Sequence, residues 1–369
     1  MSGRAPQERF MRMALHLAQR GLGDVWPNPA VGCVIVGGDD RIVGRGWTQT
    51  GGRPHAETEA LRGAGAAARG ATAYVTLEPC SHQGVTGPCA AALHQAGIAR
   101  VVSALEDPDP RVSGQGHAML RAAGIAVVTG MLAKEARALN AGFLARIQKG
   151  RPAITLKLAT TLDGKIALKN GVSQWITNEA SRRAAHVLRS RHDAVMVGIG
   201  TVLADDPELT PRVAGIERAR FVRVVADADA RLPPQSKLAS SAKNVSVWLL
   251  CAADADAGRQ SVLVKHGVRI LHVARTADGI DLAQGLAALG REGLTRVLVE
   301  GGATLAAGHI KAGLFDQIAQ FKAPTAIGGD GLSAIGALDL TSLVQAPRFR
   351  PIDTVRLGQD VLETYEPAP

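Results

Sequence analysis

The chain alternates short apolar runs with segments of helical period over most of its length, and this alternation restricts the fold more than any other feature. Strand-like runs at 71–77, 100–104 and 125–129 are separated by helix-like segments at 89–96 and 116–123. A hairpin is expected earlier, where an apolar run meets a Gly/Asp cluster. Strands that alternate with helices predict a layered α/β architecture.

The alternation is interrupted at Gln148–Pro152, where Pro152 disfavours helix at the preceding residue. With 369 residues, more than one domain is expected, and we predict domains at 1–148 and 149–369. A single helix is expected just before the break, at 133–147. Beyond it, the chain has strand-like runs at 153–158, 194–198, 221–226, 245–250, 268–273 and 296–299, helix-like runs at 179–190, 282–289 and 304–312, and a tail at 348–366 suited to one or two closing strands.

One His, one Glu and two Cys form the most specific motif of the chain. Pro54-His55-Ala56-Glu57 is followed by Glu78-Pro79-Cys80 and, after a loop, by Pro88-Cys89. Catalytic zinc takes three protein ligands and leaves one position for water, which His55, Cys80 and Cys89 would supply. Bound zinc lowers the pKa of that water. Glu57 would move protons between the water and a departing amine, as in zinc deaminases.

Each part of this motif has an ordinary explanation when it is taken alone. Two cysteines are more often core residues, and a single histidine is more often a hydrogen-bonded helix residue. The full order of ligands, each at an expected helix start, favours the metal site. His82 lies in the loop between the cysteines and is expected to hydrogen-bond the substrate or the loop rather than bind the metal.

Charge and composition narrow the class of ligand. The net charge is +9, but lysines and arginines are scattered, and aromatic residues make up 3% of the chain. A nucleic-acid reader that stacks bases on aromatic rings is therefore not expected. Ordinary solubility or a small phosphorylated ligand explains the charge. With no secretory signal and no membrane-length apolar run, a cytoplasmic protein is expected. In the cytoplasm, spaced Cys and His residues indicate a metal site, and the cysteines are not expected to form disulfides.

The spacing between the cysteines distinguishes among zinc deaminases. Nucleic-acid deaminases usually carry Pro-Cys-x-x-Cys, whereas eight residues separate Cys80 from Cys89 here. The longer loop resembles that of the riboflavin-pathway deaminase, and Asn28-Pro29-Ala30-Val31-Gly32 is similar to its Asn-Pro-x-Val-Gly element. The resemblance implies a cytidine-deaminase-like three-layer α/β/α domain in which Asn28 contacts a pyrimidine.

The second half is similar to the reductase of the same family, so the resemblance covers nearly the whole chain. The matching segments are Lys157–Lys165, Ser173–Thr177, Gly200–Arg212 and Val299–Leu305. It implies a bifunctional deaminase and reductase of riboflavin biosynthesis with a C-terminal dihydrofolate-reductase-like α/β domain. A diaminopyrimidine carrying a phosphoribosylamino group would be deaminated to the uracil, and NADPH would then reduce the ribosyl group to ribityl.

The resemblance also implies where NADPH binds. Glycines before a helix let a phosphate approach the helix N-terminus, although a tight turn explains Gly301-Gly302 equally well. Trp175, taken alone, is more often a core residue than a cofactor contact. The residues expected to hold NADPH are Ala159, Trp175, Thr201, Asp205, Gly302, Ala303, Thr304, Leu305, Ala306, Ala307 and Gly308.

The substrate of the reductase carries a phosphate, which arginine binds well. By resemblance, Ser173, Arg189, Leu209, Arg212 and Glu300 contact it, and Lys157 is a possible catalytic helper. Without the resemblance, Arg189 is more simply explained as part of a solvated basic helix face. The expected partners are thus a small phosphorylated pyrimidine and a second copy of the chain, with no nucleic acid and no membrane.

Two positions depart from the family's usual residues. Thr48 stands where a His is common, and Val85 stands where a Lys or Arg is common; both usual residues help to hold the substrate. We expect deamination to be retained with altered substrate contacts. The alternatives are a reductase with an impaired deaminase domain, a nucleic-acid deaminase, and a zinc domain with a purely structural role, which would usually have a fourth protein ligand.

Overall fold

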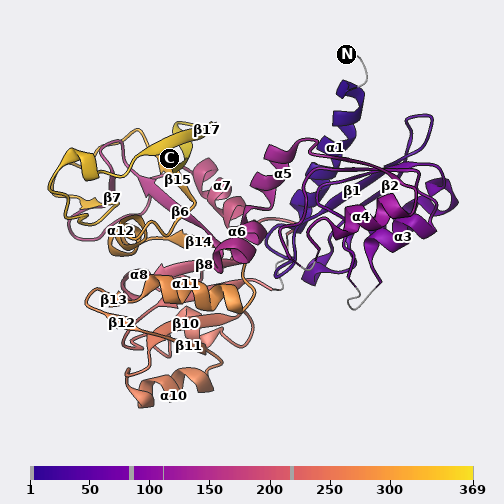
Figure 1. The fold of residues 1–369 in the computed structure, drawn as a ribbon. Helices are drawn as coiled ribbons and strands as arrows, with labels where there is room; N and C mark the ends of the chain where they lie inside the picture. The colour runs from indigo at the N-terminus through magenta and orange to yellow at the C-terminus, as the bar shows by residue number, and fades with distance from the viewer. Residues whose placement is uncertain (1–3, 83–86, 111, 217–219, 369) are drawn as a thin grey trace. The chain divides into compact units, whose positions relative to one another are not determined.

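The structure is a computed structural model that describes residues 4–82, 87–110, 112–216 and 220–368. The chain divides into two compact units, Met1–Gly150 and Arg151–Pro369. Both are α/β, as the alternation predicted, and Figure 1 traces their elements in chain order. Within the described residues, no helix is long and apolar enough to cross a membrane.

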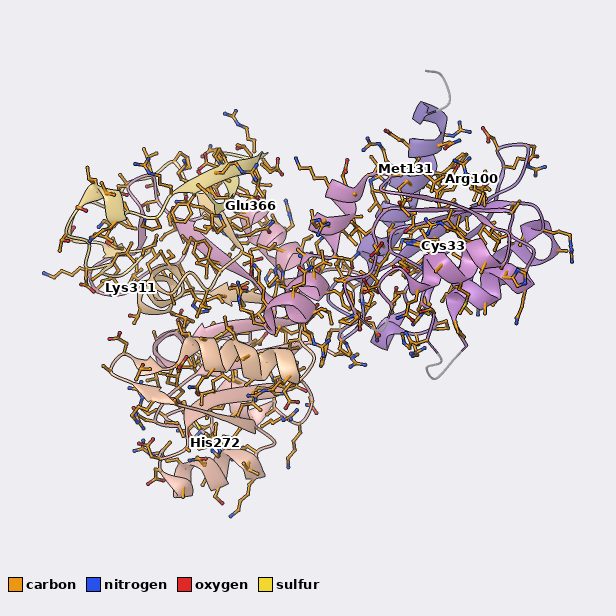
Figure 2. All side chains as sticks on the ribbon, viewed as in Figure 1. Cys33, Arg100, Met131, His272, Lys311 and Glu366 are labelled. Carbon is orange, nitrogen blue, oxygen red and sulfur yellow. The ribbon has the colours of Figure 1, made fainter. Side chains whose placement is uncertain are left out.

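The first unit is built on a five-stranded sheet in the order β2-β1-β3-β4-β5. β1 pairs antiparallel with β2 and β3, which confirms the predicted hairpin, while β3, β4 and β5 run parallel. Every residue of β1 is buried, including Cys33, which lies inside this unit in Figure 2. The strands are β1 (Gly32–Val36), β2 (Ile42–Trp47), β3 (Thr72–Val75), β4 (Arg100–Ser103) and β5 (Ala126–Thr129).

Helices cover this sheet at short range. A Cβ atom added at Gly46 of β2 would lie 2.2 Å from the carbonyl oxygen of Ala56, so α2 packs directly on the strand backbone. This close approach positions the start of α2, where two of the predicted site residues lie. The helices are α1 (Arg4–Ala18), α2 (Ala56–Ala64), α3 (Cys89–Gln95), α4 (Gln115–Ala122), α5 (Ala133–Leu139) and α6 (Ala141–Lys149), with 3-10 turns at Gln19–Gly21, Thr50–Gly52 and Gly65–Ala68.

The single helix expected at 133–147 is wrong, because the chain forms two helices that meet at Asn140. Asn140 leaves the helical conformation at φ −95° and ψ 15°. Its buried side chain accepts a hydrogen bond from the backbone N–H of Ala30 at 3.0 Å. This contact ties the segment that carries Asn28 to the C-terminal end of the unit.

The second unit has a nine-stranded sheet in the order β11-β10-β9-β8-β14-β6-β15-β18-β17. The strands from β11 to β15 are parallel, and β18 and β17 close the sheet antiparallel, as the apolar tail predicted. The strands are β6 (Ala153–Thr160), β8 (Ala194–Gly198), β9 (Val222–Ala226), β10 (Val247–Ala252), β11 (Arg269–Val273), β14 (Arg296–Glu300), β15 (Gln317–Lys322), β17 (Phe349–Leu357) and β18 (Asp360–Pro367).

The helices of this unit place their N-termini near the carboxyl ends of the parallel strands, which is where α/β sheets bind ligands. They are α7 (Glu179–Ser190), α8 (Ile199–Asp205), α9 (Lys237–Ser240), α10 (Ala257–Lys265), α11 (Leu282–Arg291) and α12 (Ala303–Lys311), with a 3-10 turn at Leu343–Gln345. Two small sheets pair β12 (Arg275–Thr276) with β13 (Gly279–Ile280) and β7 (Lys165–Ala167) with β16 (Leu332–Ser333).

Candidate metal centre and candidate reductase cleft

His55, Cys80 and Cys89 come together in the first unit. His55 is the N-cap of α2, Cys80 follows β3 in a loop, and Cys89 is the first residue of α3. One ligand atom of each lies within 4.8 Å of those of the other two. The Nδ1 atom of His55 is 3.3 Å from the Sγ of Cys89 and 3.6 Å from the Sγ of Cys80. The sequence-predicted ligand set is therefore assembled in space.

These distances fit a tetrahedral zinc ion. Bonds of about 2.0 Å to nitrogen and about 2.3 Å to sulfur at the tetrahedral angle separate the two ligand atoms by roughly 3.6 Å. Hydrogen bonds from Cys89 and His55 lower the pKa of the Cys80 thiol to about 4, so a thiolate is favoured there. Among the described residues, the group contains three ligands and does not include His82, which leaves a coordination position open.

Glu57 lies two residues after His55 and is fully buried beside the ligands. Burial raises the pKa of its carboxyl group to about 7. A carboxyl group that titrates near neutral pH can both accept and donate a proton. Glu57 lines the pocket but is not part of the ligand group. This is the placement that a general acid and base beside a metal requires.

Asn28 and His82 line the same pocket as the predicted ligands His55 and Cys80. Asn28 is held against the turn at Gly52, where φ is +87° and an added Cβ atom would lie 1.9 Å from the Asn28 amide nitrogen. Only glycine fits this approach. The Nδ1 atom of His82 is buried without a hydrogen-bond partner within the described part of the chain. The Asn28 amide, which also donates to the Gly51 carbonyl at 3.5 Å, is thus fixed in the pocket wall, and the contacts of Asn28 and His82 with substrate remain predictions.

Thr48 is buried in the pocket wall, where its hydroxyl accepts a hydrogen bond from the backbone N–H of Val31 at 2.9 Å. It therefore joins the end of β2 to the segment before β1 instead of presenting a cation to the pocket. Val85, the other departure from the family pattern, lies outside the described residues.

Sequence reasoning left part of the pocket wall without a role. Asp107, Asp109, Val112 and Phe143 also line it. Burial raises the pKa of Asp107 to about 6. The Asp107-Pro108 pair by itself indicates a turn. However, a turn signal says nothing about which pocket it borders, so only the fold shows this wall.

The second unit contains a cleft of about 1770 Å³ at the carboxyl ends of the parallel strands. Its wall combines the ends of β6, β8 and β9 with the first turns of α8 and α12. Every residue predicted to hold NADPH lines this cleft: Ala159, Trp175, Thr201, Asp205, Gly302, Ala303, Thr304, Leu305, Ala306, Ala307 and Gly308.

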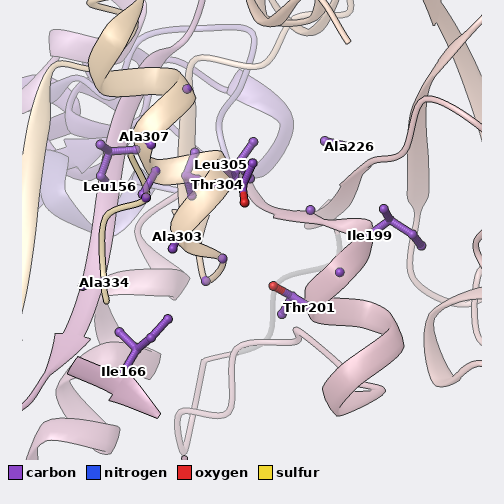
Figure 3. Close-up of a pocket in the computed structure, with 18 of the residues that line it drawn as sticks. Leu156, Ile166, Ile199, Thr201, Ala226, Ala303, Thr304, Leu305, Ala307 and Ala334 are labelled. Carbon is purple, nitrogen blue, oxygen red and sulfur yellow. The ribbon is translucent and has the colours of Figure 1, made fainter. Parts of the chain in front are cut away.

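The start of α12 has the features of a phosphate cradle. Gly301 and Gly302 have φ angles of +76° and +79°, and no side chain caps the helix at Gly302. The first N–H groups of the helix therefore face the cleft without a side-chain acceptor. Thr201 of α8, labelled in Figure 3, lies close to this turn: a Cβ atom added at Gly301 would lie 3.2 Å from its hydroxyl oxygen. The residues present fit a pyrophosphate-bearing cofactor.

Trp175 is 69% exposed, which excludes the core explanation that its residue type alone favoured. Its ring lines the cleft and carries the guanidinium group of Arg182 at 4.6 Å from the ring centroid. A large, exposed aromatic ring at a cleft offers a flat apolar surface to a ligand ring.

Glu300, Arg189 and Lys157 form a charged cluster at the end of β14. The Arg189 Nε and Nη2 atoms donate to the two Glu300 oxygens at 2.8 and 3.0 Å, and Nη1 donates to the carbonyl of Thr210. The Lys157 Nζ atom is 3.9 Å from Glu300. Burial alone would raise the pKa of Glu300, but Arg189 and Lys157 outweigh it and lower the pKa to about 2. Arg189 is therefore not a solvated basic residue, since it is buried in an ion pair.

The remaining residues assigned to the reductase substrate are dispersed. Ser173 and Lys157 line the cleft. Leu209 is buried with a φ of +60°, and Arg212 is exposed and pairs with Glu208. Leu209, Arg212, Arg189 and Glu300 are not among the residues that line the cleft, so their substrate contacts remain predictions.

Comparison with known proteins matches each unit to a family. Residues 152–362 match the RibD C-terminal domain, and residues 4–105 match the cytidine and deoxycytidylate deaminase zinc-binding region. The riboflavin biosynthesis protein RibD of Escherichia coli is 40% identical over 96% of this chain and 97% of its own length. RibD of Aquifex aeolicus is 41% identical, with the same coverage.

The chain belongs to the RibD family.

Solved RibD structures agree over the full length. Acinetobacter baumannii RibD matches with a TM-score of 0.89 at 38% identity and covers 99% of both chains. A diaminohydroxyphosphoribosylaminopyrimidine deaminase/5-amino-6-(5-phosphoribosylamino)uracil reductase from Thermotoga maritima matches with a TM-score of 0.86 at 34% identity and the same coverage. The chain is therefore a riboflavin biosynthesis enzyme with a zinc-dependent deaminase domain and an NADPH-dependent reductase domain, and the expectation of a bifunctional enzyme is confirmed.

Proposed function

We propose that the two units catalyse consecutive steps on one pyrimidine. The first converts 2,5-diamino-6-(5-phosphoribosylamino)pyrimidin-4(3H)-one and water to 5-amino-6-(5-phosphoribosylamino)uracil and ammonia. The second uses NADPH to reduce the ribosyl group to ribityl. The observation that carries the proposal is that one chain holds both a three-ligand His/Cys/Cys centre beside a buried glutamate and a glycine-edged cleft at the ends of parallel strands.

In the deaminase unit, His55, Cys80 and Cys89 would hold zinc through the atoms that already face one another. When bound, zinc lowers the pKa of a water molecule so that a nucleophile is available near neutral pH. Glu57 would accept a proton from the attacking water and deliver one to the departing amine. Asn28 and His82 would orient the pyrimidine from the pocket wall.

In the reductase unit, the glycines and the start of α12 would bind the cofactor's pyrophosphate, and Trp175 would contact a ring of the cofactor. NADPH supplies the hydride when bound. The Glu300 carboxylate, kept ionised by its two cations, would hold Arg189 and Lys157 in place, and its own contact with the substrate stays a prediction because Glu300 is not among the residues that line the cleft. Lys157 lies beside it with its ammonium group near the cleft, where a proton donor to the reduced sugar is needed.

The test follows both products from purified protein and the diaminopyrimidine phosphate. Ammonia release and NADPH oxidation are expected together, and a zinc chelator should stop both with this substrate. Supplying the deaminated uracil instead should restore NADPH oxidation in the presence of the chelator. No ammonia release from zinc-loaded protein would contradict the deaminase assignment.

The alternative of an impaired deaminase domain retains one supporting observation. Thr48 is uncharged, and its hydroxyl accepts a hydrogen bond from the backbone. It therefore cannot replace the histidine that is common at this position in holding the substrate. Under this alternative, zinc-loaded protein would oxidise NADPH with the uracil substrate but release no ammonia from the diaminopyrimidine. The assay above separates the two outcomes.

We also propose a homodimer formed through the reductase unit, in the cytoplasm. β17 is the edge strand of the large sheet, and Ile352 and Val355 are exposed on it. Edge strands with exposed apolar residues favour pairing with another chain, and a lysine on such an edge opposes it. Sedimentation should give a dimer for the parent chain and a monomer for Ile352→Lys. The cytoplasm is supported by the thiolate ligands, which require reduced cysteines.

A further inference from the structure

The carboxylate of Glu78 is the most completely engaged acidic group near the metal centre. Its side chain is 0% exposed and lies between β3 and the ligand Cys80. One oxygen accepts hydrogen bonds from the backbone N–H groups of Asp107 at 3.1 Å and Gly114 at 3.0 Å, and the other accepts from that of His117 at 3.1 Å. A single side chain thus binds three points of the segment from 107 to 117.

That segment forms one wall of the deaminase pocket. Asp107, Asp109 and Val112 line the pocket together with His55, Cys80 and Glu57. The N–H of Asp109 donates to the Asp107 carboxylate at 2.9 Å, so the two acidic residues hold one another. At Gly116, an added Cβ atom would lie 1.9 Å from the carbonyl oxygen of Pro79, which shows how closely the segment is drawn against the metal-ligand loop.

We propose that Glu78 is a positioning residue that sets the described parts of the pocket wall, 107–110 and 112–117, at a defined distance from the metal ligands. Two residues after Glu78 the chain reaches Cys80, so one short stretch carries both a ligand and the anchor of the opposite wall. Loss of the anchor would leave the metal and Glu57 in place but would loosen the surface that receives the substrate. This role rests on the deaminase activity proposed above.

A second cation site is the competing explanation for the same cluster. Ligand atoms of Glu78, Glu106 and His117 lie within 4.8 Å of one another, and the buried Nε2 of His117 has no partner among the described residues. However, three N–H groups already occupy the Glu78 oxygens, and a carboxylate has about four lone-pair sites. At most one of these sites is left for a cation. The anchor accounts for all three hydrogen bonds of Glu78 and the cation site accounts for none of them, so the geometry favours the anchor.

The main experiment compares Glu78→Gln with the parent chain. Glutamine keeps the shape but replaces one acceptor oxygen with an N–H₂ group, which cannot accept from the donors that face it. We expect the KM for the diaminopyrimidine phosphate to rise by about tenfold or more and kcat to change by less than about threefold. Bound zinc should remain at one ion per chain, and reductase activity with the uracil substrate should be unchanged.

Glu106→Gln is the matched control. Glu106 belongs to the same cluster but is exposed, and within the described residues it accepts only a 3.5 Å hydrogen bond from Ser113. Its KM should equal that of the parent chain. An equal rise in KM in this variant, or a second metal ion in the parent chain that Glu78→Gln lacks, would support the cation site and overturn the proposal.

Gly116→Ala tests the same wall without touching Glu78. The added methyl group must push α4 away from Pro79, so the KM should rise while zinc content and kcat are retained. An unchanged KM in both Glu78→Gln and Gly116→Ala, or loss of zinc together with kcat, would contradict the positioning role. Absence of ammonia release from the parent chain would instead contradict the proposed deaminase function, so the two failures are distinguishable.

Discussion

Glu57 and Glu300 are both buried glutamates, one in each unit, and their surroundings shift their pKa values in opposite directions. Burial raises the pKa of Glu57 to about 7, whereas Arg189 and Lys157 overcome burial and lower the pKa of Glu300 to about 2. The first carboxyl group can exchange a proton near neutral pH. The second stays ionised and serves as a fixed negative charge.

The difference shows how identical side chains acquire different chemistry from their neighbours. Glu57 lies next to the three residues that would hold zinc. The positive charge of that ion would take the place of a lysine or arginine partner for Glu57. Glu300 has two permanent cations instead, one of them in a two-point ion pair. A proton carrier and an electrostatic anchor are therefore distinguished by their partners rather than by residue type or burial.

Removing zinc should produce the largest difference between the activities of the two units. With a chelator, ammonia release should fall to background because only the first unit depends on the metal. NADPH oxidation with the deaminated substrate should be unaffected. A parallel loss of reductase activity would show that the two sites are not independent and would break the comparison.

Glu57→Gln should lower ammonia release by about a thousandfold, since glutamine cannot transfer the proton. Zinc content and reductase activity should match those of the parent chain. Glu59→Gln, on the same helix and paired with Arg62, is the control and should keep its activity. Retained deamination in Glu57→Gln would assign the proton transfer to another group.

Glu300→Gln tests the fixed charge through stability. The pKa of Glu300 is lowered from 4.5, so its contribution is complete above pH 4.5 and is lost as the pH falls toward 2. Urea unfolding should show the variant less stable by up to about 3 kcal/mol at pH 7, with a smaller gap at pH 3. Glu179→Gln, in an exposed pair with Arg183, should change stability little at either pH. A gap that widens in acid would contradict the assigned pKa direction.

Gly302→Ala should have the smallest effect. A non-glycine residue at a φ of +79° costs about 1 kcal/mol, which corresponds to roughly a fivefold rise in the Kd for NADPH as the loop shifts. Fluorescence titration of NADPH measures it directly. Gly258→Ala lies on α10, outside the residues that line the cleft, and should bind NADPH as the parent chain does. Unaltered binding in Gly302→Ala would remove the helix start from the cofactor site.

Several features could be predicted because they depend on residues close together in the chain. The hairpin of β1 and β2 and most of the helices follow from local period and turn residues. The candidate zinc site was identified for two local reasons. His55 and Glu57 share a short motif, while Cys80 follows a predicted strand and Cys89 begins a predicted helix. Seven of the eleven residues predicted to hold NADPH form one contiguous stretch, 302–308, which lines the cleft.

Other features depended on partners far away in the sequence. The periodic stretch at 133–147 gave no sign of a break, because the bond that accompanies the break joins Asn140 to Ala30, 110 positions earlier. Tryptophan is a residue type that is common in cores, and only the fold shows that Trp175 is exposed. In the sequence Arg189 resembles a solvated helix residue. Its partner Glu300 lies on β14, 111 positions away, and meets it only in the fold.

The sequence by itself determined the alternating α/β architecture, the candidate metal ligands and the family, since these depend on residue type, period and spacing. The tertiary structure decided the opposite pKa shifts of Glu57 and Glu300, and it assigned Glu78 its three backbone partners. The physical reason is that pKa and positioning depend on burial and on neighbouring charges, which are set by segments that meet only after folding.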